Sequence, residues 1–120
     1  MKVLVADDDR IWVELLTTTF REEGHDVLAA FDGMQATMHA FQSFPDLVVL
    51  DVQMPGGTGL EALKRLKMST KTAKIPVLVV SGAEDAALPG RLEAMGAARF
   101  VKKPATQKQV LDAARALFPR

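Results

Sequence analysis

Residues 3–9 of the chain, VLVADDD, place a run of small apolar side chains directly before three aspartates. Short, unbroken apolar runs of this kind are typical of strands that are buried on both faces of a sheet. They recur along the chain at residues 3–6, 27–30, 47–50, 75–80 and 100–101. A longer stretch with room for a helix follows each run.

The stretches between these runs have the spacing of amphipathic helices. Ile11 and Leu15 are four residues apart, and Met34, Met38 and Phe41 repeat at helical intervals within residues 32–44. The final segment also predicts a helix, with apolar residues at Val110, Leu111, Ala114, Leu117 and Phe118.

Local chemistry predicts where several helices begin and end. Asp32 with Gln35 and Thr58 with Glu61 have the spacing of a capping box, which satisfies exposed backbone amides. Gly24 and Gly96 mark helix ends. Pro89 and Gly90 interrupt the segment expected to form the fourth helix, so we expect this helix to begin late or to fray at its start.

Five strands alternating with five helices predict an α/β fold. Right-handed crossovers between parallel strands place helices on both sheet faces, so the sheet is doubly wound and five-stranded. With 120 residues and no linker or repeat, we expect one domain that spans residues 1–120.

The composition excludes several classes of function. Fifteen basic and fifteen acidic residues give no net charge, which offers nothing global to attract nucleic acid or an anionic membrane. Cysteine is absent from the sequence, so disulfides and thiolate metal sites are excluded. Without a secretory signal or a membrane-spanning apolar run, we expect a cytoplasmic protein.

Polar residues gather where the predicted strands end. In an open parallel sheet, ligands bind beyond the carboxyl ends of the strands, beside the point where strand order reverses. The residues that follow the first, third, fourth and fifth strands are Asp7, Asp8 and Asp9; Asp51; Ser81; and Lys102, Lys103 and Pro104.

A divalent cation would relieve the repulsion between these carboxylates. Mg²⁺ prefers oxygen ligands and commonly uses one or two carboxylates, so Asp7, Asp8 and Asp51 suit it. Zinc fits less well, because His25 and His39 fall far from this edge of the sheet.

A carboxylate in this position can act as a nucleophile toward phosphorus, provided that the charge of the transferring group is neutralised. Lys103 and the cation could neutralise it, and Ser81 could donate a hydrogen bond to a phosphate oxygen. Close backbone approach is favoured by glycines 56, 57 and 59. These residues predict phosphoryl transfer onto Asp51.

The sequence therefore resembles the receiver domain of bacterial two-component response regulators, including the chemotaxis regulators, over essentially its whole length. The resemblance implies a flavodoxin-like sheet with strand order 2-1-3-4-5 and a site for Mg²⁺ or Mn²⁺. In it, Asp8 binds the metal more directly, Asp7 acts largely through water, Asp51 is phosphorylated and also binds the metal, and Gln53 contributes its backbone carbonyl.

The resemblance also assigns the residues that respond to phosphorylation. Ser81 matches the hydroxyl residue that turns toward the phosphoryl group, and Phe100 matches the aromatic switch position. Lys103 matches the family's lysine, and its bond to Pro104 is expected to be cis. Side chains vary within the family at the positions of Gln53 and Ala83, so the lifetime of the phosphorylated state does not carry over.

Phosphorelay signalling is the function that the resemblance implies. A histidine kinase or phosphotransfer protein would be the donor, and a downstream effector would bind the surface formed by the fourth helix, fifth strand and fifth helix. The domain would catalyse only its own phosphorylation and dephosphorylation, without direct contact with nucleic acid or membrane.

Simpler interpretations exist for each residue and for the whole. Asp9 could cap the first helix, Ser81 could satisfy backbone at a strand end, and Phe100 could simply pack. Other functions are a receiver that works without phosphorylation, a magnesium-dependent phosphohydrolase and a flavin-binding module. Against the phosphohydrolase, residue 53 is not a second aspartate; against flavin, three carboxylates would repel its phosphate.

Overall fold

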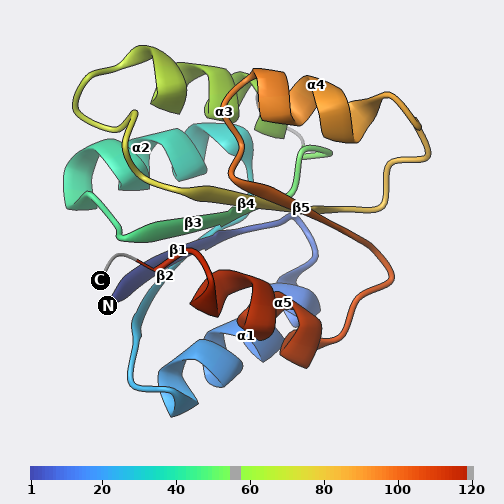
Figure 1. The fold of residues 1–120 in the computed structure, drawn as a ribbon. Coiled ribbons are helices and arrows are strands. Elements are labelled where there is room, and N and C mark those ends of the chain that lie inside the picture. Colours follow the sequence, from blue (N-terminus) through green and yellow to red (C-terminus); the bar gives the residue numbers. More distant parts are fainter. Residues whose placement is uncertain (55–57, 119–120) are drawn as a thin grey trace.

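The computed structural model describes residues 1–54 and 58–118, and shows strands and helices in strict alternation (Figure 1). The glycines at 56 and 57 that were expected to approach the phosphoryl group lie outside these residues. The elements are β1 (Lys2–Ala6), α1 (Arg10–Glu22), β2 (Asp26–Ala30), α2 (Gly33–Ser43), β3 (Leu47–Leu50), α3 (Gly59–Met68), β4 (Val77–Ser81), α4 (Leu88–Ala94), β5 (Arg99–Lys102) and α5 (Gln107–Arg115).

The strands form one parallel sheet in the order β2-β1-β3-β4-β5, which confirms the predicted fold class and strand order. Leu4 in β1 pairs with Leu28 on one side and with Val48 on the other. Chain order therefore reverses at β1, and the ends of β1 and β3 lie next to each other. This is the point at which open α/β sheets bind ligands.

Helices cover both faces of the sheet, with α1 and α5 on one face and α2, α3 and α4 on the other (Figure 1). Successive residues of β1 alternate between the two cores: Val3 and Val5 pack on the α1 and α5 side, whereas Leu4 and Ala6 pack on the other. All four are at most 2% exposed. This two-sided burial explains why the strand sequences are continuously apolar.

The expected helix starts at residues 32 and 58 are confirmed. Asp32 Oδ1 accepts a hydrogen bond from the Gln35 amide at 2.7 Å, and Thr58 Oγ1 accepts one from the Glu61 amide at 3.2 Å. The Gln35 side chain returns to the amide of Phe31 rather than to Asp32, so this capping box is displaced by one residue. A complete capping box at the start of α5 was not predicted.

Other expected boundaries are confirmed as well. Gly24 and Gly96 follow α1 and α4 with φ angles of 89° and 102°, in the left-handed region that favours glycine. Helix α4 begins late, at Leu88, with Pro89 in its first turn and no side-chain cap. The run at residues 75–80 begins its strand only at Val77.

The apolar stripes expected on α1 and α2 are only partly buried. Ile11 is 73% exposed and Met34 is 67% exposed. In α1 the buried stripe consists instead of Val13, Leu16 and Phe20, which are spaced three and four residues apart. The spacing of Ile11 and Leu15 is helical, but it marks a solvent-facing side of the helix.

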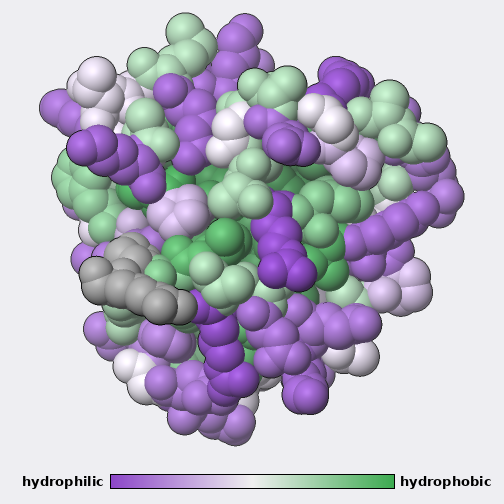
Figure 2. All heavy atoms as spheres, in the orientation of Figure 1, coloured by the Kyte–Doolittle hydropathy of each residue, from purple (hydrophilic) through white to green (hydrophobic). Residues whose placement is uncertain are grey.

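The surface seen from the side of β5 is not uniformly polar. Apolar surface shows along the middle of this face, between polar side chains above and below (Figure 2). β5 is an edge strand, and its Phe100 and Val101 are only half-buried. In the part of the chain described here, each helix is too short or too polar to span a lipid bilayer.

Gly59 fixes the start of α3 against the end of β3. A Cβ atom at this position would lie 2.0 Å from the Asp51 carbonyl oxygen and 2.4 Å from Val52 Cα. Because both obstacles are backbone atoms, they cannot yield as a flexible side chain would. Helix α3 can therefore approach β3 this closely only with glycine at position 59.

We expect Gly59→Ala to lower the free energy of unfolding by about 3 kcal/mol, because the added methyl group forces α3 away from β3. Gly90→Ala is the matched control, since a Cβ there meets no atom within 4 Å. Within α4 it should raise stability by about 0.5–1 kcal/mol. Urea denaturation measures both, and equal effects would contradict the packing described for Gly59.

Candidate functional site

Backbone hydrogen bonds hold three polar residues at the carboxyl edge of the sheet. The amide of Asp7 donates to Ala30 O at 3.1 Å, and that of Asp51 donates to Ala6 O at 2.9 Å. The amide of Lys103 donates to Ser81 O at 3.0 Å. Each of the three donors directly follows a strand, so the sheet's own hydrogen bonding continues into the site and fixes its backbone.

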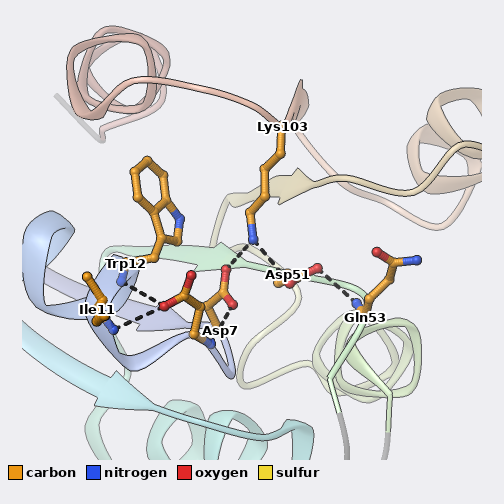
Figure 3. A network of polar contacts seen from close by, with 7 residues as sticks. Asp7, Ile11, Trp12, Asp51, Gln53 and Lys103 are labelled. Atoms are coloured by element: carbon orange, nitrogen blue, oxygen red, sulfur yellow. Dashed lines mark hydrogen bonds and ion pairs between the residues drawn. The ribbon is translucent and has the colours of Figure 1, made fainter.

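Lys103 lies between two buried carboxylates (Figure 3). Its Nζ donates to Asp7 Oδ2 at 2.6 Å and to Asp51 Oδ2 at 3.3 Å. Asp7 and Asp51 are only 3% and 5% exposed. Burial of two such charges is costly unless they are paired, and the ammonium group supplies that pairing.

The second oxygen of each buried carboxylate accepts a backbone hydrogen bond. Asp7 Oδ1 accepts from the Asp9 amide at 3.0 Å, and Asp51 Oδ1 accepts from the Gln53 amide at 2.9 Å. Both bonds span two residues, which is the pattern of an Asx turn. Each carboxylate is therefore held at both oxygens, one by its own loop and one by Lys103.

Asp8 joins these two acids to form a cluster suited to a cation. One carboxylate oxygen from each of Asp7, Asp8 and Asp51 lies within 4.8 Å of the other two, and Asp8 is exposed where the others are buried. Three carboxylates outnumber the single lysine, which leaves the cluster negative. Oxygen ligands and uncompensated negative charge fit a hard divalent cation, so the cluster could hold a metal.

Desolvation by burial acts in opposite directions on the pKa of Asp7 and on the pKa of Lys103. Desolvation raises the pKa of Asp7, and the hydrogen bonds from Lys103 and Asp9 offset it only in part. Desolvation would lower the pKa of Lys103, but the hydrogen bonds and charges of Asp7 and Asp51 outweigh it and raise the pKa. The lysine therefore stays charged, while ionised Asp7 carries an unrelieved electrostatic cost.

Ser81 ends β4 with a fully buried hydroxyl group. Within residues 1–54 and 58–118, this Oγ is the buried side-chain polar atom that has no hydrogen-bond partner. Buried hydroxyls are usually paired, and an unpaired one costs about 1–3 kcal/mol. The group is thus available for a bond that the protein itself does not supply.

The remaining predicted residues surround this centre. The Lys103–Pro104 peptide bond is cis. Gln53 lies beside Asp51, with its side-chain amide on the side away from Asp7 (Figure 3). Phe100 is half-buried and packs against the core on the α2, α3 and α4 side of the sheet.

The simpler interpretation of Asp9 also holds. Asp9 caps α1, with Oδ1 accepting from the amides of Ile11 and Trp12. Asp9 therefore has a structural role, while its neighbours Asp7 and Asp8 form the cluster. Lys102 pairs at the surface with Glu84 at 3.4 Å, although adjacent Lys103 turns into the site.

Sequence reasoning did not select Trp12, whose ring lies near Asp7 and Lys103 (Figure 3). With Asp9, Lys103, Pro104 and Ala105 it lines a hollow of about 450 Å³. Its position in the sequence could have indicated this location, because Trp12 lies in the first turn of the helix that follows the three aspartates.

Comparison with known proteins agrees with this fold and site. The family model for the response regulator receiver domain matches residues 3–115. Among solved structures, the Francisella response regulator 1452 receiver domain is 29% identical, with a TM-score of 0.88 and coverage of 97% of this chain and 94% of that one. The Vibrio cholerae chemotaxis response regulator CheY4 is 26% identical, with a TM-score of 0.90 and 98% coverage of both chains.

The receiver domain of NtrX from Brucella abortus is 30% identical, with a TM-score of 0.83 and coverage of 96% of this chain and 97% of that one. The family match identifies the chain as a phosphoacceptor signalling module rather than a conventional enzyme, and the doubly wound sheet with an acidic pocket beside a lysine agrees with that assignment. The chain belongs to the response regulator receiver domain family. Its acidic pocket is consistent with aspartate phosphorylation in two-component signalling.

We expect Lys103→Met to lower the free energy of unfolding in EDTA by about 1–3 kcal/mol, because it leaves two buried carboxylates without their cation. Lys102→Met is the matched control, since its partner Glu84 is 89% exposed on the side chain. Such exposed ion pairs contribute little to the free energy of unfolding. Urea denaturation near neutral pH measures both, and a Lys103→Met protein as stable as the control would contradict the pairing.

Proposed function

We propose that this receiver accepts a phosphoryl group on Asp51 from the phosphohistidine of a histidine kinase or phosphotransfer protein, with Mg²⁺ or Mn²⁺ as cofactor. The observation that carries the proposal is the contact of one ammonium group with both Asp7 and Asp51. A lysine that reaches the carboxylate of Asp51 is placed to neutralise a group that becomes attached there.

In the proposed transfer, an Asp51 carboxylate oxygen forms a bond to phosphorus while the bond from phosphorus to the donor's imidazole nitrogen breaks. The bonding electron pair leaves with that nitrogen, and the product is an acyl phosphate on Asp51. The Gln53 amide holds one Asp51 oxygen in place during this step. Lys103 neutralises charge that develops on the phosphoryl oxygens.

Asp7, Asp8 and Asp51 would hold the metal, together with the backbone carbonyl of Gln53. When bound, the ion supplies positive charge that stabilises the phosphoryl oxygens in the transition state. Asp8 is the exposed member of the set, so its carboxylate faces the solvent from which the ion arrives. The buried pair contributes fixed oxygens that the Asx turns already orient.

Ser81 and Lys103 provide the proposed link between phosphorylation and partner binding. The unpaired Ser81 hydroxyl gains a hydrogen-bond acceptor only when a phosphoryl group is present. That difference in free energy can shift the population of conformations in the segment that leads into α4. A change in the position of half-buried Phe100 would then alter the effector-binding surface of α4, β5 and α5.

Competing functions fit the chain less well. A phosphohydrolase would require an acid-base group next to Asp51, and position 53 carries glutamine. A flavin phosphate would meet the negative cluster of Asp7, Asp8 and Asp51. A cytoplasmic location, where histidine kinases present their phosphohistidine, belongs to the same proposal.

We expect wild-type protein treated with Mg²⁺ and acetyl phosphate to gain the mass of one phosphoryl group on Asp51. Asp51→Asn should gain none, because an amide oxygen is a poor nucleophile toward phosphorus. Asp112→Asn, at an exposed carboxylate on α5, is the matched control and should be modified as wild type. Mass spectrometry reads all three, and an unmodified wild type would contradict the proposal.

We expect Mg²⁺ affinity to fall as pH is lowered, beginning at a higher pH than an ordinary carboxyl would give. Burial raises the pKa of Asp7, so protons compete with the ion earlier. Fluorescence of Trp12, the single tryptophan, can follow the titration beside the site.

Asp7→Asn should bind Mg²⁺ more weakly and lose this component of the pH dependence. In the metal-free wild type, the raised pKa of Asp7 stabilises the folded state at pH values below the pKa that Asp7 has in the unfolded chain. That contribution to the free energy of unfolding is lost as the pH rises through the pKa of Asp7 in the folded state. An affinity that does not change with pH, or that changes equally in Asp7→Asn, would contradict the role given to Asp7.

A further inference from the structure

Helices α2 and α3 lie side by side on one face of the sheet (Figure 1). An open groove lies between their side chains. Its volume is about 350 Å³, within the range of ligand-binding clefts. None of the three clustered acids contributes to its lining, which consists of Gly33, Met34, Thr37, Met38, Phe41, Thr58, Glu61, Ala62 and Arg65.

The α2 wall of this groove is unusually apolar for an exposed surface. Helix α2 contains no Asp, Glu, Lys or Arg, and its Met34 and Met38 are 67% and 50% exposed. Exposed Phe44 and Met68 lie at the ends of α2 and α3. Methionine is flexible and polarisable, and proteins use it on surfaces that receive helices of varied sequence.

The groove is already formed without a ligand. Gly59 holds the start of α3 tightly against β3, because only hydrogen fits between them. Phe41 packs against the core below, and Ala62 is buried. The Thr37 hydroxyl is used within α2, where it donates to Gly33 O at 2.9 Å. A binding partner would therefore not have to order the two walls first.

The spacing of side chains along the groove matches a second helix. Met34, Met38 and Phe41 follow one another at four and three residues, and span two turns, or about 10 Å, of α2. Glu61 and Arg65 form the facing wall with the same four-residue step. Amphipathic helices bind such grooves with apolar anchors at matching intervals.

The charged side chains around the groove indicate which charge a binding partner would carry. Helix α3 carries Lys64, Arg65 and Lys67 against Glu61 alone, and α2 adds no charged side chain. Lys67 is bound to the carbonyls of Ala73 and Ile75, which leaves Lys64 and Arg65 facing outward.

The Glu61–Arg65 pair is 3.8 Å long and more than half exposed on both side chains, so its exchange for another partner costs little. The N-terminal end of α3, which is capped by the uncharged side chain of Thr58, adds partial positive charge at one end of the groove, whereas the carboxylate of Asp32 caps α2. Acidic side chains flanking an apolar stripe would complement these features.

We propose that the groove between α2 and α3 binds an amphipathic helix of a partner protein that has an apolar stripe flanked by acidic residues. This binding surface is distinct from the acidic cluster and from the surface of α4, β5 and α5. Met34, Met38 and Phe41 bind the apolar stripe, and Arg65 and Lys64 bind the flanking carboxylates.

The test uses a fluorescein-labelled synthetic helix of about 15 residues, long enough to populate helix in water. It carries leucines three and four residues apart and glutamates on its flanks. Fluorescence anisotropy should show saturable binding to the whole chain, and amide shift changes should map to α2 and α3. Met38→Glu should weaken binding at least about tenfold, a change well outside the error of such titrations.

The matched control is Ile11→Glu, which places the same charge on an exposed apolar position on the opposite face of the sheet. It should bind as wild type does. Met34→Glu provides a second groove variant, and circular dichroism verifies that each variant is folded. A peptide with lysine in place of every glutamate should bind more weakly than the acidic one.

Several results would overturn the proposal. The lysine peptide could bind as tightly as the acidic one, or Ile11→Glu could weaken binding as much as Met38→Glu does. Sedimentation could show a wild-type dimer that Met38→Glu dissociates, which would make the groove an interface between two copies. Met38-dependent binding to phosphatidylglycerol vesicles without peptide binding would indicate a lipid surface instead.

Discussion

The pairing of Lys103 with Asp7 and Asp51 is the interaction on which the site depends. A parallel sheet whose order reverses at β1 brings the ends of β1 and β3 together, and each end carries a carboxylate. Two negative charges that are 3% and 5% exposed could not persist there without a cation. The lysine that follows β5 neutralises one of these charges, and Asp8 adds a further negative charge, so the cluster could hold a metal.

The backbone around this cluster is held in place by the packed core and by the hydrogen bonds of the sheet. Two apolar layers cover the sheet, and Asp7, Asp51 and Lys103 each continue a strand's hydrogen bonding by one residue. The exception is Ser81, whose buried hydroxyl has no partner in the described part of the chain. An unsatisfied group beside an otherwise satisfied frame is where the arrival of a phosphoryl group would have the largest effect on conformation.

Much of this arrangement could be predicted from the sequence, because it follows from strong local signals. Unbroken apolar runs identified the strands, and the rule for ligand sites in open sheets then selected the residues after them, including Asp7, Asp51 and Lys103. Helix caps at Asp32 and Thr58 were equally local. The late start of α4 followed from the restricted geometry of Pro89.

The failures concern features that depend on packing between distant segments. Helical spacing could not show which side of α1 faces the sheet, and Ile11 and Leu15 proved to be on the exposed side. The close packing of α3 on β3 that Gly59 permits was not predicted. The position of Trp12 beside Lys103 joins residues far apart in the chain, and only the folded structure shows it.

A crystal structure of the protein grown with Mg²⁺ and beryllofluoride tests the central claim most directly, because this group mimics a phosphoryl group on a carboxylate. The account predicts that beryllofluoride is attached to Asp51, with Lys103 and Ser81 both bonded to it and the ion among Asp7, Asp8 and Asp51. Beryllofluoride attached elsewhere, or an ion away from these three acids while Lys103 remains on Asp7 and Asp51, would contradict it.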